Sequence, residues 1–365
     1  YTKAEPEKRQ VMDIETRVVV KEYQAEVLID ENGNKFVAKF PTHVTKAIQY
    51  GSWVKSNAVF MNCYQMCSLK RIEDNFADQL HIKLSKGTVY NASFEAYHSL
   101  EKFEHWLKTI LPLQKVLNAD ETGVNVNGKR IWLHTLCNHK YTLFHVNGKR
   151  GKSAMDEMGI LPIFKGYLCH DHWKAYFKFF CKHLLCNAHH LRELTYIEEV
   201  ESQKWAKKMR EFLVKINLDV KDKGGKLSPS RQKKVIEEYR KILNNGEKEN
   251  EMPKKIKGKR GRVKKTKSRN LLERFQNFEV EILAFMTDKD LPFTNNQGEN
   301  DLRMTKVQQK VSGCFRSMEG ANIFARIRSY INTCKKNKIN ITEALRALFE
   351  GHLDLIIAKI QNYAD

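Results

Sequence analysis

Between positions 116 and 186 the sequence alternates strand-like and helix-like segments in the order β-β-β-α-β-α-β, and this order restricts the fold more than any other feature. Three hairpin-linked strands followed by strands that alternate with helices predict an α/β fold with a mixed five-stranded sheet and flanking helices. The expected strands are 116–126, 131–136, 141–146, one ending at His170, and 184–186, with a tight turn at Asn127-Gly128 and helices at 153–158 and 173–180.

Three acidic residues occupy distinctive places in this pattern. Asp120 lies within the first strand, and Asp171 directly follows the fourth. Glu299 comes much later, just after Asn295-Asn296, which are suitable caps for a helix beginning there. Acids at these places are typical of the ribonuclease H-like fold. Carboxylates suit Mg²⁺ or Mn²⁺, and two such ions held by three acids can cut phosphodiester bonds, so the three residues are predicted to be catalytic metal ligands.

The charge of the chain indicates its partner. The sequence has 64 Lys and Arg against 43 Asp and Glu, a formal net charge of +21. A positive field of this size favours polyanions, and nucleic acid is the usual one. A basic protein that binds no nucleic acid is the alternative.

The sequence also bears on the compartment. No stretch is apolar enough to predict a membrane span or a secretory signal. The eight cysteines are scattered, which favours reduced thiols. We therefore expect a cytoplasmic protein.

The pattern predicts a division into six parts. Residues 46–112 are expected to be helical, because Leu69, Ile72, Phe76 and Leu80 line one helix face and Ser85 can cap a second helix. Two helices at this spacing fit a DNA-binding helix-turn-helix and equally an ordinary helical hairpin. The other parts are a small β module at 1–45, a catalytic core at 113–200 and 286–350, a helical insertion at 201–285, and a tail at 351–365.

Two groups of basic residues are candidates for DNA contact. The segment 253–269 contains no acid, so charge repulsion should keep it extended until phosphate neutralises it, although a solvated linker is the alternative. Basic residues also recur at helical spacing after Glu299, where a solvated helix face is the alternative. The candidates are Lys254, Lys255, Lys259, Arg260, Arg262, Lys264 and Lys265 in the first group, and Arg303, Lys306, Lys310 and Arg316 in the second.

A C-x-x-H pair follows the last predicted strand. Cys186 and His189 have the spacing of zinc ligands, but a structural zinc site needs four ligands. Cys181 and His183 lie on the preceding turn, so the sequence does not support a closed site, and zinc is not expected. We assign Cys186, His189, His190 and Arg192 to core packing or to support of the metal ligands, with His189, His190 and Arg192 as possible DNA contacts.

Several strings in the chain resemble the bacterial transposases of the insertion sequence 66 family, from about residue 11 to residue 349. The resemblance implies a DDE-type transposase with a ribonuclease H-like core interrupted by a helical insertion. It implies that Asp120, Asp171 and Glu299 bind two Mg²⁺ or Mn²⁺ ions, and that a homo-oligomer acts on double-stranded DNA at element ends and target. The matching strings are 118–123, 132–134, 170–176, 186–194, 292–303 and 312–317.

One departure from the family and two rival functions accompany the resemblance. Family members commonly carry a zinc ribbon with cysteine pairs near the N-terminus, whereas the matching stretch Ile29 to Gly33 has no cysteine. The first rival function is an inactive derivative that only binds DNA, and the intact set of three acids argues against it. The second is a ribonuclease H-like nuclease that does not join strands.

Overall fold

The computed structural model describes residues 1–41, 43–253 and 263–363. The chain separates into two compact units, residues 1–95 and 96–365. In the first unit, β1 (Val27–Ile29) and β2 (Lys35–Val37) form an antiparallel pair around a turn in which Gly33 has φ +81°. The strand-like run 17–20 lies outside any strand, because its valines are exposed and have no second layer to pack against.

From Ser52 onward the first unit is helical, as expected. The predicted helix at 69–80 is confirmed: Ile72 and Phe76 on its apolar face are buried. Ser85 Oγ accepts the Thr88 N–H at 3.1 Å, which confirms it as a cap. The elements are α1 (Ser52–Val59), a π-helical turn η1 (Phe60–Tyr64), α2 (Leu69–Leu80) and α3 (Lys86–Ser99), the last continuing into the second unit.

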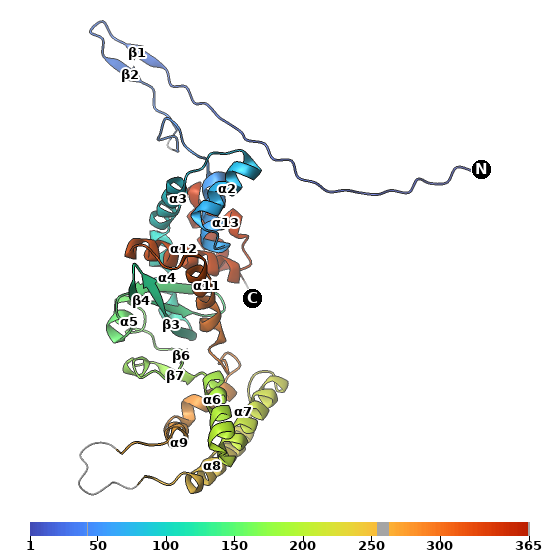
Figure 1. Ribbon diagram of the computed structural model, residues 1–365, viewed down its shortest axis with the longest axis vertical. Helices are drawn as coiled ribbons and strands as arrows, with labels where there is room; N and C mark the ends of the chain where they lie inside the picture. Colours follow the sequence, from blue (N-terminus) through green and yellow to red (C-terminus); the bar gives the residue numbers. More distant parts are fainter. Residues whose placement is uncertain (42, 254–262, 364–365) are drawn as a thin grey trace. The chain divides into compact units, whose positions relative to one another are not determined.

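The second unit contains the predicted five-stranded mixed sheet, in the order β5-β4-β3-β6-β7 (Figure 1). Strands β3, β4 and β5 are antiparallel, whereas β6 and β7 run parallel to β3. Asn127 and Gly128 both have positive φ, which closes the β3–β4 hairpin as predicted. The bounds are β3 (Val116–Val126), β4 (Lys129–Cys137), β5 (Thr142–Asn147), β6 (Tyr167–His170) and β7 (Lys182–Leu185).

The connection between β6 and β7 differs from the prediction. A helix at 173–180 was expected, but the structure has only the 3₁₀ turn η3 (Tyr176–Lys178). Asp171 Oδ1 accepts the Trp173 N–H at 2.9 Å and forms a tight turn, and Phe179 is already extended. Residues 171–181 are too few for a full crossover helix, so the aromatic residues fill a compact loop instead. Cys186, expected in the last strand, is the residue that precedes helix α6 (Asn187–Glu201).

Helices from the C-terminal part of the chain cover the sheet (Figure 1). Helix α11 (Asn296–Ser312) packs on β3 and β4, and α12 (Met318–Lys336) packs on β5. The N–H groups of Thr142 and Phe144 in the edge strand β5 donate to Thr333 and Ser329 of α12. The remaining elements here are α4 (Glu101–Ile110), η2 (Leu111–Leu113), α5 (Lys152–Glu157), α13 (Ile341–Phe349) and α14 (Leu353–Asn362).

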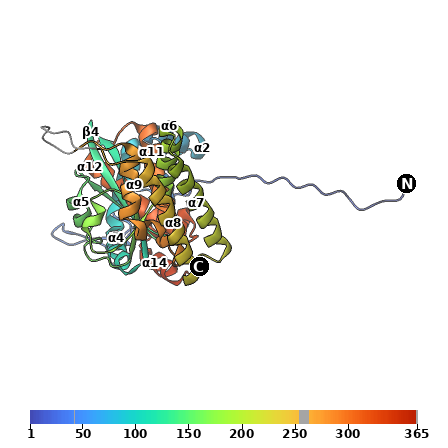
Figure 2. The ribbon, with the colours of Figure 1, turned by 90° about the horizontal axis from the view of Figure 1, so that it is seen from below.

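The segment between α6 and α11 is helical and has its own core. Helices α7, α8 and α9 pack side by side (Figure 2), and their buried centre holds Trp205, Tyr239 and Phe275. The two polar groups there are satisfied, because the Trp205 indole donates to Ser268 Oγ and the Tyr239 hydroxyl donates to the Phe275 carbonyl. The bounds are α7 (Lys204–Asp222), α8 (Pro229–Glu249), α9 (Lys267–Asn277), α10 (Glu279–Leu283) and η4 (Ala284–Met286).

Two further expectations concern the cysteines and the membrane. All eight cysteines are free. Among the described helices, none combines the length and the apolar character that crossing a bilayer requires.

Candidate functional site

Asp120 and Asp171 come together because β3 and β6 are parallel neighbours. In their register Asn118 pairs with Cys169, and each acid lies two residues beyond its member of that pair. Both carboxylates therefore lie level with each other, just beyond the last residue pair that joins the two central strands. Asp120 Oδ1 accepts the Glu121 N–H at 2.9 Å, and Asp171 Oδ1 accepts the Trp173 N–H.

Glu299 reaches these acids from the first turn of α11. Its helix begins beside β3, and a Cβ atom added to Gly298 would lie 3.3 Å from the Asp120 Cβ. The negative charges of Asp171 and Glu299 both act on Asp120. The structure thus brings together three acids that lie far apart in the sequence.

The charge of Asp120 is poorly compensated. Burial, followed by the charges of Glu121, Asp171 and Glu299, raises the pKa of Asp120 to about 7. In addition, Glu299 Oε1 is buried and has no hydrogen-bond partner. A divalent cation would remove the repulsion and satisfy this oxygen, and carboxylates are the donors that Mg²⁺ and Mn²⁺ prefer. These residues therefore fit such ions.

Asn295 holds the start of α11 against the sheet. It was expected to cap the helix, and it does occupy the position before the helix, but its side chain makes no capping bond. Instead its amide donates to the Ala119 carbonyl at 2.9 Å and accepts a bond from the Asn118 side chain at 2.8 Å. Its backbone N–H donates to the Cys186 sulfur at 3.0 Å. The bonds to β3 outcompete a cap because both asparagines are buried and need partners.

A buried ion pair beside Asp120 was missed in the sequence. The Glu121 side chain is 2 % exposed, and its Oε1 accepts two bonds from Arg150, at 2.8 and 2.7 Å. Its Oε2 accepts a bond from the Tyr176 hydroxyl. Burial raises the pKa of Glu121 while the two partners oppose the rise. The only sequence signal was the adjacency of Glu121 to Asp120.

Aromatic rings fix the position of Arg150. Its guanidinium lies over the ring of Trp173 at 4.3 Å and over that of Trp132 at 4.8 Å. Trp173 and Tyr176 both belong to the loop that follows Asp171. Glu121 and Arg150 therefore connect β3 to the loop that carries the second acid.

The C-x-x-H pair lies next to Glu299. His189 Nδ1 is 3.8 Å from Glu299 Oε1, and Arg192 Nη2 is 3.7 Å from the same oxygen. Burial raises the pKa of the Cys186 thiol. Cys186, His189 and Glu299 each offer one donor atom, all within 4.8 Å of one another.

The other histidines in this part of the sequence face different surroundings. His190 is buried, contacts Asn187 Oδ1 at 3.0 Å and packs edge-on against Phe275. Burial holds its pKa well below the usual range. His183, considered as a partner of the C-x-x-H pair, contacts His170 and the Phe179 carbonyl instead. Both therefore belong to the packed interior.

The predicted basic residues after Glu299 lie on the exposed side of α11 and just beyond it. Arg303, Lys310 and Arg316 are exposed, and the last follows Phe315, which bonds to the tip of the β3–β4 hairpin. Lys306 is also exposed, but its ammonium donates to the Gly123 carbonyl at 2.9 Å. Among the described contacts, the charged groups of the other three residues make no comparable bond to the backbone. These residues are Arg303, Lys310 and Arg316.

The basic segment is described only at its end. Lys254, Lys255, Lys259, Arg260 and Arg262 lie outside the described residues. Lys264 is exposed, whereas Lys265 is paired with Glu273 at 2.5 Å.

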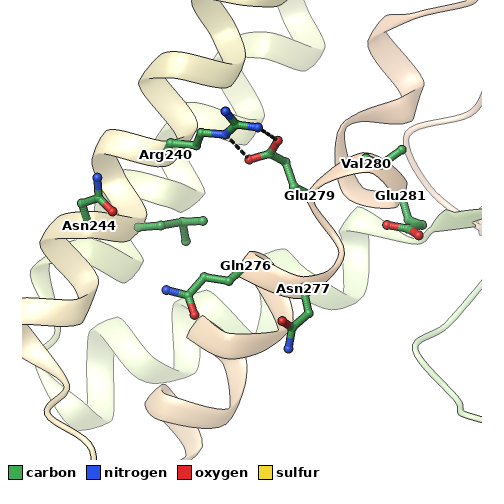
Figure 3. A pocket seen from close by; sticks show the side chains of 8 residues that line it. Arg240, Asn244, Gln276, Asn277, Glu279, Val280 and Glu281 are labelled. Atoms are coloured by element: carbon green, nitrogen blue, oxygen red, sulfur yellow. Dashed lines mark hydrogen bonds and ion pairs between the residues drawn. The ribbon is translucent and has the colours of Figure 1, made fainter.

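A hollow of about 560 Å³ lies between α8 and the α9–α10 segment (Figure 3). Its lining includes Arg240, Asn244 and Gln276, with Arg240 paired to Glu279 at 2.7 Å. None of the three acids lines it, and Arg240 is held by Glu279, so the hollow is not the catalytic site.

The comparison with protein families agrees with this geometry. A family model described as "Transposase IS66 family" matches residues 47–323, a span that includes all three acids. No curated protein matches the chain.

Proposed function

The chain belongs to the IS66 family of transposases, and on that premise we propose that it cuts DNA at the ends of a mobile element and joins the cut strand to target DNA. The observation that carries this proposal is the convergence of Asp171 and Glu299 on Asp120, whose pKa their charges help to raise. Family membership supports a role in transposition, and the convergent acids favour a catalytic role over DNA binding alone.

We also propose that the sheet and its helices are a ribonuclease H-like core. The strand order β5-β4-β3-β6-β7 and the acids on β3, after β6 and on α11 support this assignment. In this proposal residues 113–200 and 286–350 are the core and residues 201–285 are the insertion. Residues 1–45 and 46–112 are then a β module and a helical DNA-binding region.

Asp120, Asp171 and Glu299 would hold two Mg²⁺ or Mn²⁺ ions. When bound, such ions supply an activated water for in-line attack on phosphorus and neutralise charge on the leaving 3′ oxygen. The chain itself contributes the placement of the acids: the register of β3 and β6 aligns two of them, and Asn295 fixes the helix that carries the third.

The remaining predicted residues would bind DNA around the acids. Arg303, Lys310 and Arg316 are exposed on and just after the helix that carries Glu299, which suits contact with phosphates near the cut. The basic residues of the segment 253–269 would add affinity without sequence choice. We expect a homo-oligomer to assemble on double-stranded DNA, because two element ends must be processed together.

The proposal is tested with duplex oligonucleotides that carry the terminal repeats flanking the coding sequence. In Mg²⁺, the wild-type protein should cut one end and yield a joined product with target DNA. Asp171→Asn and Glu299→Gln should bind the duplex normally and yield neither product. Asp354→Asn, which alters an exposed carboxylate paired with Lys102, is the matched control and should behave as wild type.

Each contrary outcome favours one rival. Cleavage without a joined product would favour a nuclease. Binding without cleavage by the wild-type protein would favour an inactive derivative. Wild-type cleavage rates in Asp171→Asn or Glu299→Gln would overturn the assignment of the acids.

A further inference from the structure

In the folded chain, Glu299 lies beside Cys186 and His189 and adds a third possible metal-ligand atom to theirs. We propose that Cys186, His189 and Glu299 form a site for a borderline-soft divalent cation, with Zn²⁺ as its ligand, that shares Glu299 with the proposed catalytic site. The expected consequence of zinc binding is that Glu299 is no longer available for catalysis, and this consequence rests on the proposed function.

The spacing of the donors fits a tetrahedral site after a small adjustment. Zinc bonds to nitrogen, oxygen and sulfur of about 2.0 to 2.3 Å place neighbouring donors roughly 3.3 to 3.8 Å apart. His189 Nδ1 and Glu299 Oε1 are already 3.8 Å apart. All three donors lie within 4.8 Å of one another, so side-chain movements of about 1 Å would close the set. Three protein ligands leave a fourth position for water, as in open zinc sites.

Two of the donor atoms lack a hydrogen bond, although the Arg192 guanidinium lies 3.7 Å from one of them, Glu299 Oε1. His189 Nδ1 and Glu299 Oε1 are both buried and make no hydrogen bond. A buried polar atom without a partner costs about 1 to 3 kcal/mol, and native proteins keep few of them. A cation between the two atoms would satisfy both at once.

The surroundings of Cys186 suit a metal-bound thiolate. The residue precedes α6, and the backbone N–H of Asn295 donates to its sulfur at 3.0 Å. The backbone N–H groups of His189 and Ala188 also act to lower the pKa of this thiol, against the effect of burial. Donors at a helix N-terminus stabilise a thiolate once a metal has displaced the proton. The sulfur is buried and therefore protected from competing thiols.

The donor types separate this site from the neighbouring one. Thiolate and imidazole ligands select Zn²⁺ over Mg²⁺, whereas a site of carboxylates alone suits Mg²⁺ or Mn²⁺. Glu299 takes part in both sets, because its charge acts on Asp120 and its Oε1 lies 3.8 Å from His189 Nδ1. A cation bound to Cys186 and His189 would therefore compete with the proposed catalytic ions for one carboxylate.

Cobalt(II) titration of the full chain tests the site by a readout other than activity. Cobalt(II) substitutes for zinc and gives a thiolate charge-transfer band in the near ultraviolet. We expect one equivalent to produce this band, zinc to abolish it, and Cys186→Ser to lack it. Cys314→Ser, which alters a partly exposed cysteine outside the site, should retain the band and is the matched control. His189→Gln and Glu299→Gln should weaken cobalt binding at least about tenfold, and circular dichroism confirms that each variant folds.

The contrary results are equally definite. A band of full intensity in Cys186→Ser, or no band in the wild-type protein, would overturn the site and leave His189 and Arg192 as simple ion-pair partners of Glu299. Zinc should also inhibit Mg²⁺-dependent cleavage by the wild-type protein. Cleavage without a cobalt band defeats the site and leaves the proposed function intact, whereas a cobalt band without cleavage defeats the proposed function and leaves the site intact.

Discussion

The Asn295 side-chain amide donates a hydrogen bond of 2.9 Å to the carbonyl oxygen of Ala119. The residue before helix α11 is therefore bonded to the residue before Asp120 on the central strand. Since Glu299 lies one turn into that helix, a single buried bond sets how far the third acid can move from the first.

Replacing Asn295 should lower both the stability of the protein and its cleavage activity. Asn295→Ala leaves the Ala119 carbonyl and the Asn118 amide unpaired in a buried place, so we expect a loss of about 2 kcal/mol or more in the free energy of unfolding. Cleavage should fall much further than DNA binding, because Glu299 loses its anchor. Urea unfolding and the oligonucleotide assay measure the two effects.

A control for this prediction is available in helix α13. Asn340→Ala removes a side chain that caps that helix by accepting the Thr342 and Glu343 N–H groups, and should cost about 1 kcal/mol without changing cleavage. Equal cleavage by Asn295→Ala and the wild-type protein would show that the bond to Ala119 does not position Glu299.

Gly298 should tolerate no side chain. A Cβ atom there would lie 3.2 Å from the Asn295 amide and 3.3 Å from the Asp120 Cβ, so in Gly298→Ala the Asn295 and Asp120 side chains, or the start of α11, must shift by a few tenths of an ångström. We expect cleavage to fall at least about tenfold. Gly320→Ala, also in the first turn of a helix, meets only Ser317 Oγ at 3.4 Å and should cleave normally. Equal activity of the two variants would refute the close approach.

Most elements that depend on neighbouring residues were predictable, and the three acids were expected to meet, but other contacts between distant residues were missed. The β3–β4 hairpin was predictable because Asn127-Gly128 adopts positive φ locally. The helix expected at 173–180 was wrong because Asp171 forms a turn and the connection to β7 is short. The bonds of Asn295 to β3 join residues far apart in the chain, and no local pattern announces them. For the same reason the proximity of Cys186 to Glu299 was not visible.

The raised pKa of Asp120 predicts a pH-dependent stability. The folded chain holds this proton up to about pH 7, whereas an exposed aspartate releases it near 3.8. The proton that Asp120 retains in the folded chain therefore contributes its full stabilisation below about pH 4, and this stabilisation is lost as the pH rises to about 7. Asp120→Asn mimics the protonated form and keeps its bond to the Glu121 N–H. In metal-free buffer the variant should become more stable than wild type over this range, by up to about 4 kcal/mol at pH 8.

Urea unfolding in chelator at several pH values measures this difference. Added Mg²⁺ should stabilise the wild-type protein at pH 8 and have little effect on Asp120→Asn. A constant stability difference from pH 4 to pH 8 would show that Asp120 does not titrate in this range.

The ion pair of Glu121 should act on catalysis through the neighbouring acids. Glu121→Gln removes the charge that holds Arg150 and the Asp171 loop. Replacing a residue that supports metal ligands typically lowers metal affinity or activity about 10- to 100-fold. We expect a higher Mg²⁺ concentration for half-maximal cleavage, a readout that a purely structural effect would not change. Glu279→Gln breaks a similar pair with Arg240 in the insertion (Figure 3) and should leave the Mg²⁺ dependence unchanged. An unaltered Mg²⁺ dependence in Glu121→Gln would remove its positioning role.

Arg303 should contact a DNA phosphate rather than a base. It lies one helical turn beyond Glu299, is exposed, and forms no ion pair among those found in the described part of the chain. Arg303→Ala should weaken binding to every duplex by a similar factor and reduce the slope of log affinity against log salt by about one. Arg346→Ala, which alters an exposed arginine paired with Glu350 on helix α13, should leave the slope unchanged. Fluorescence anisotropy from 50 to 200 mM salt, roughly the range over which phosphate contacts dominate, measures both slopes. An unchanged slope in Arg303→Ala would place this face of α11 away from the DNA backbone.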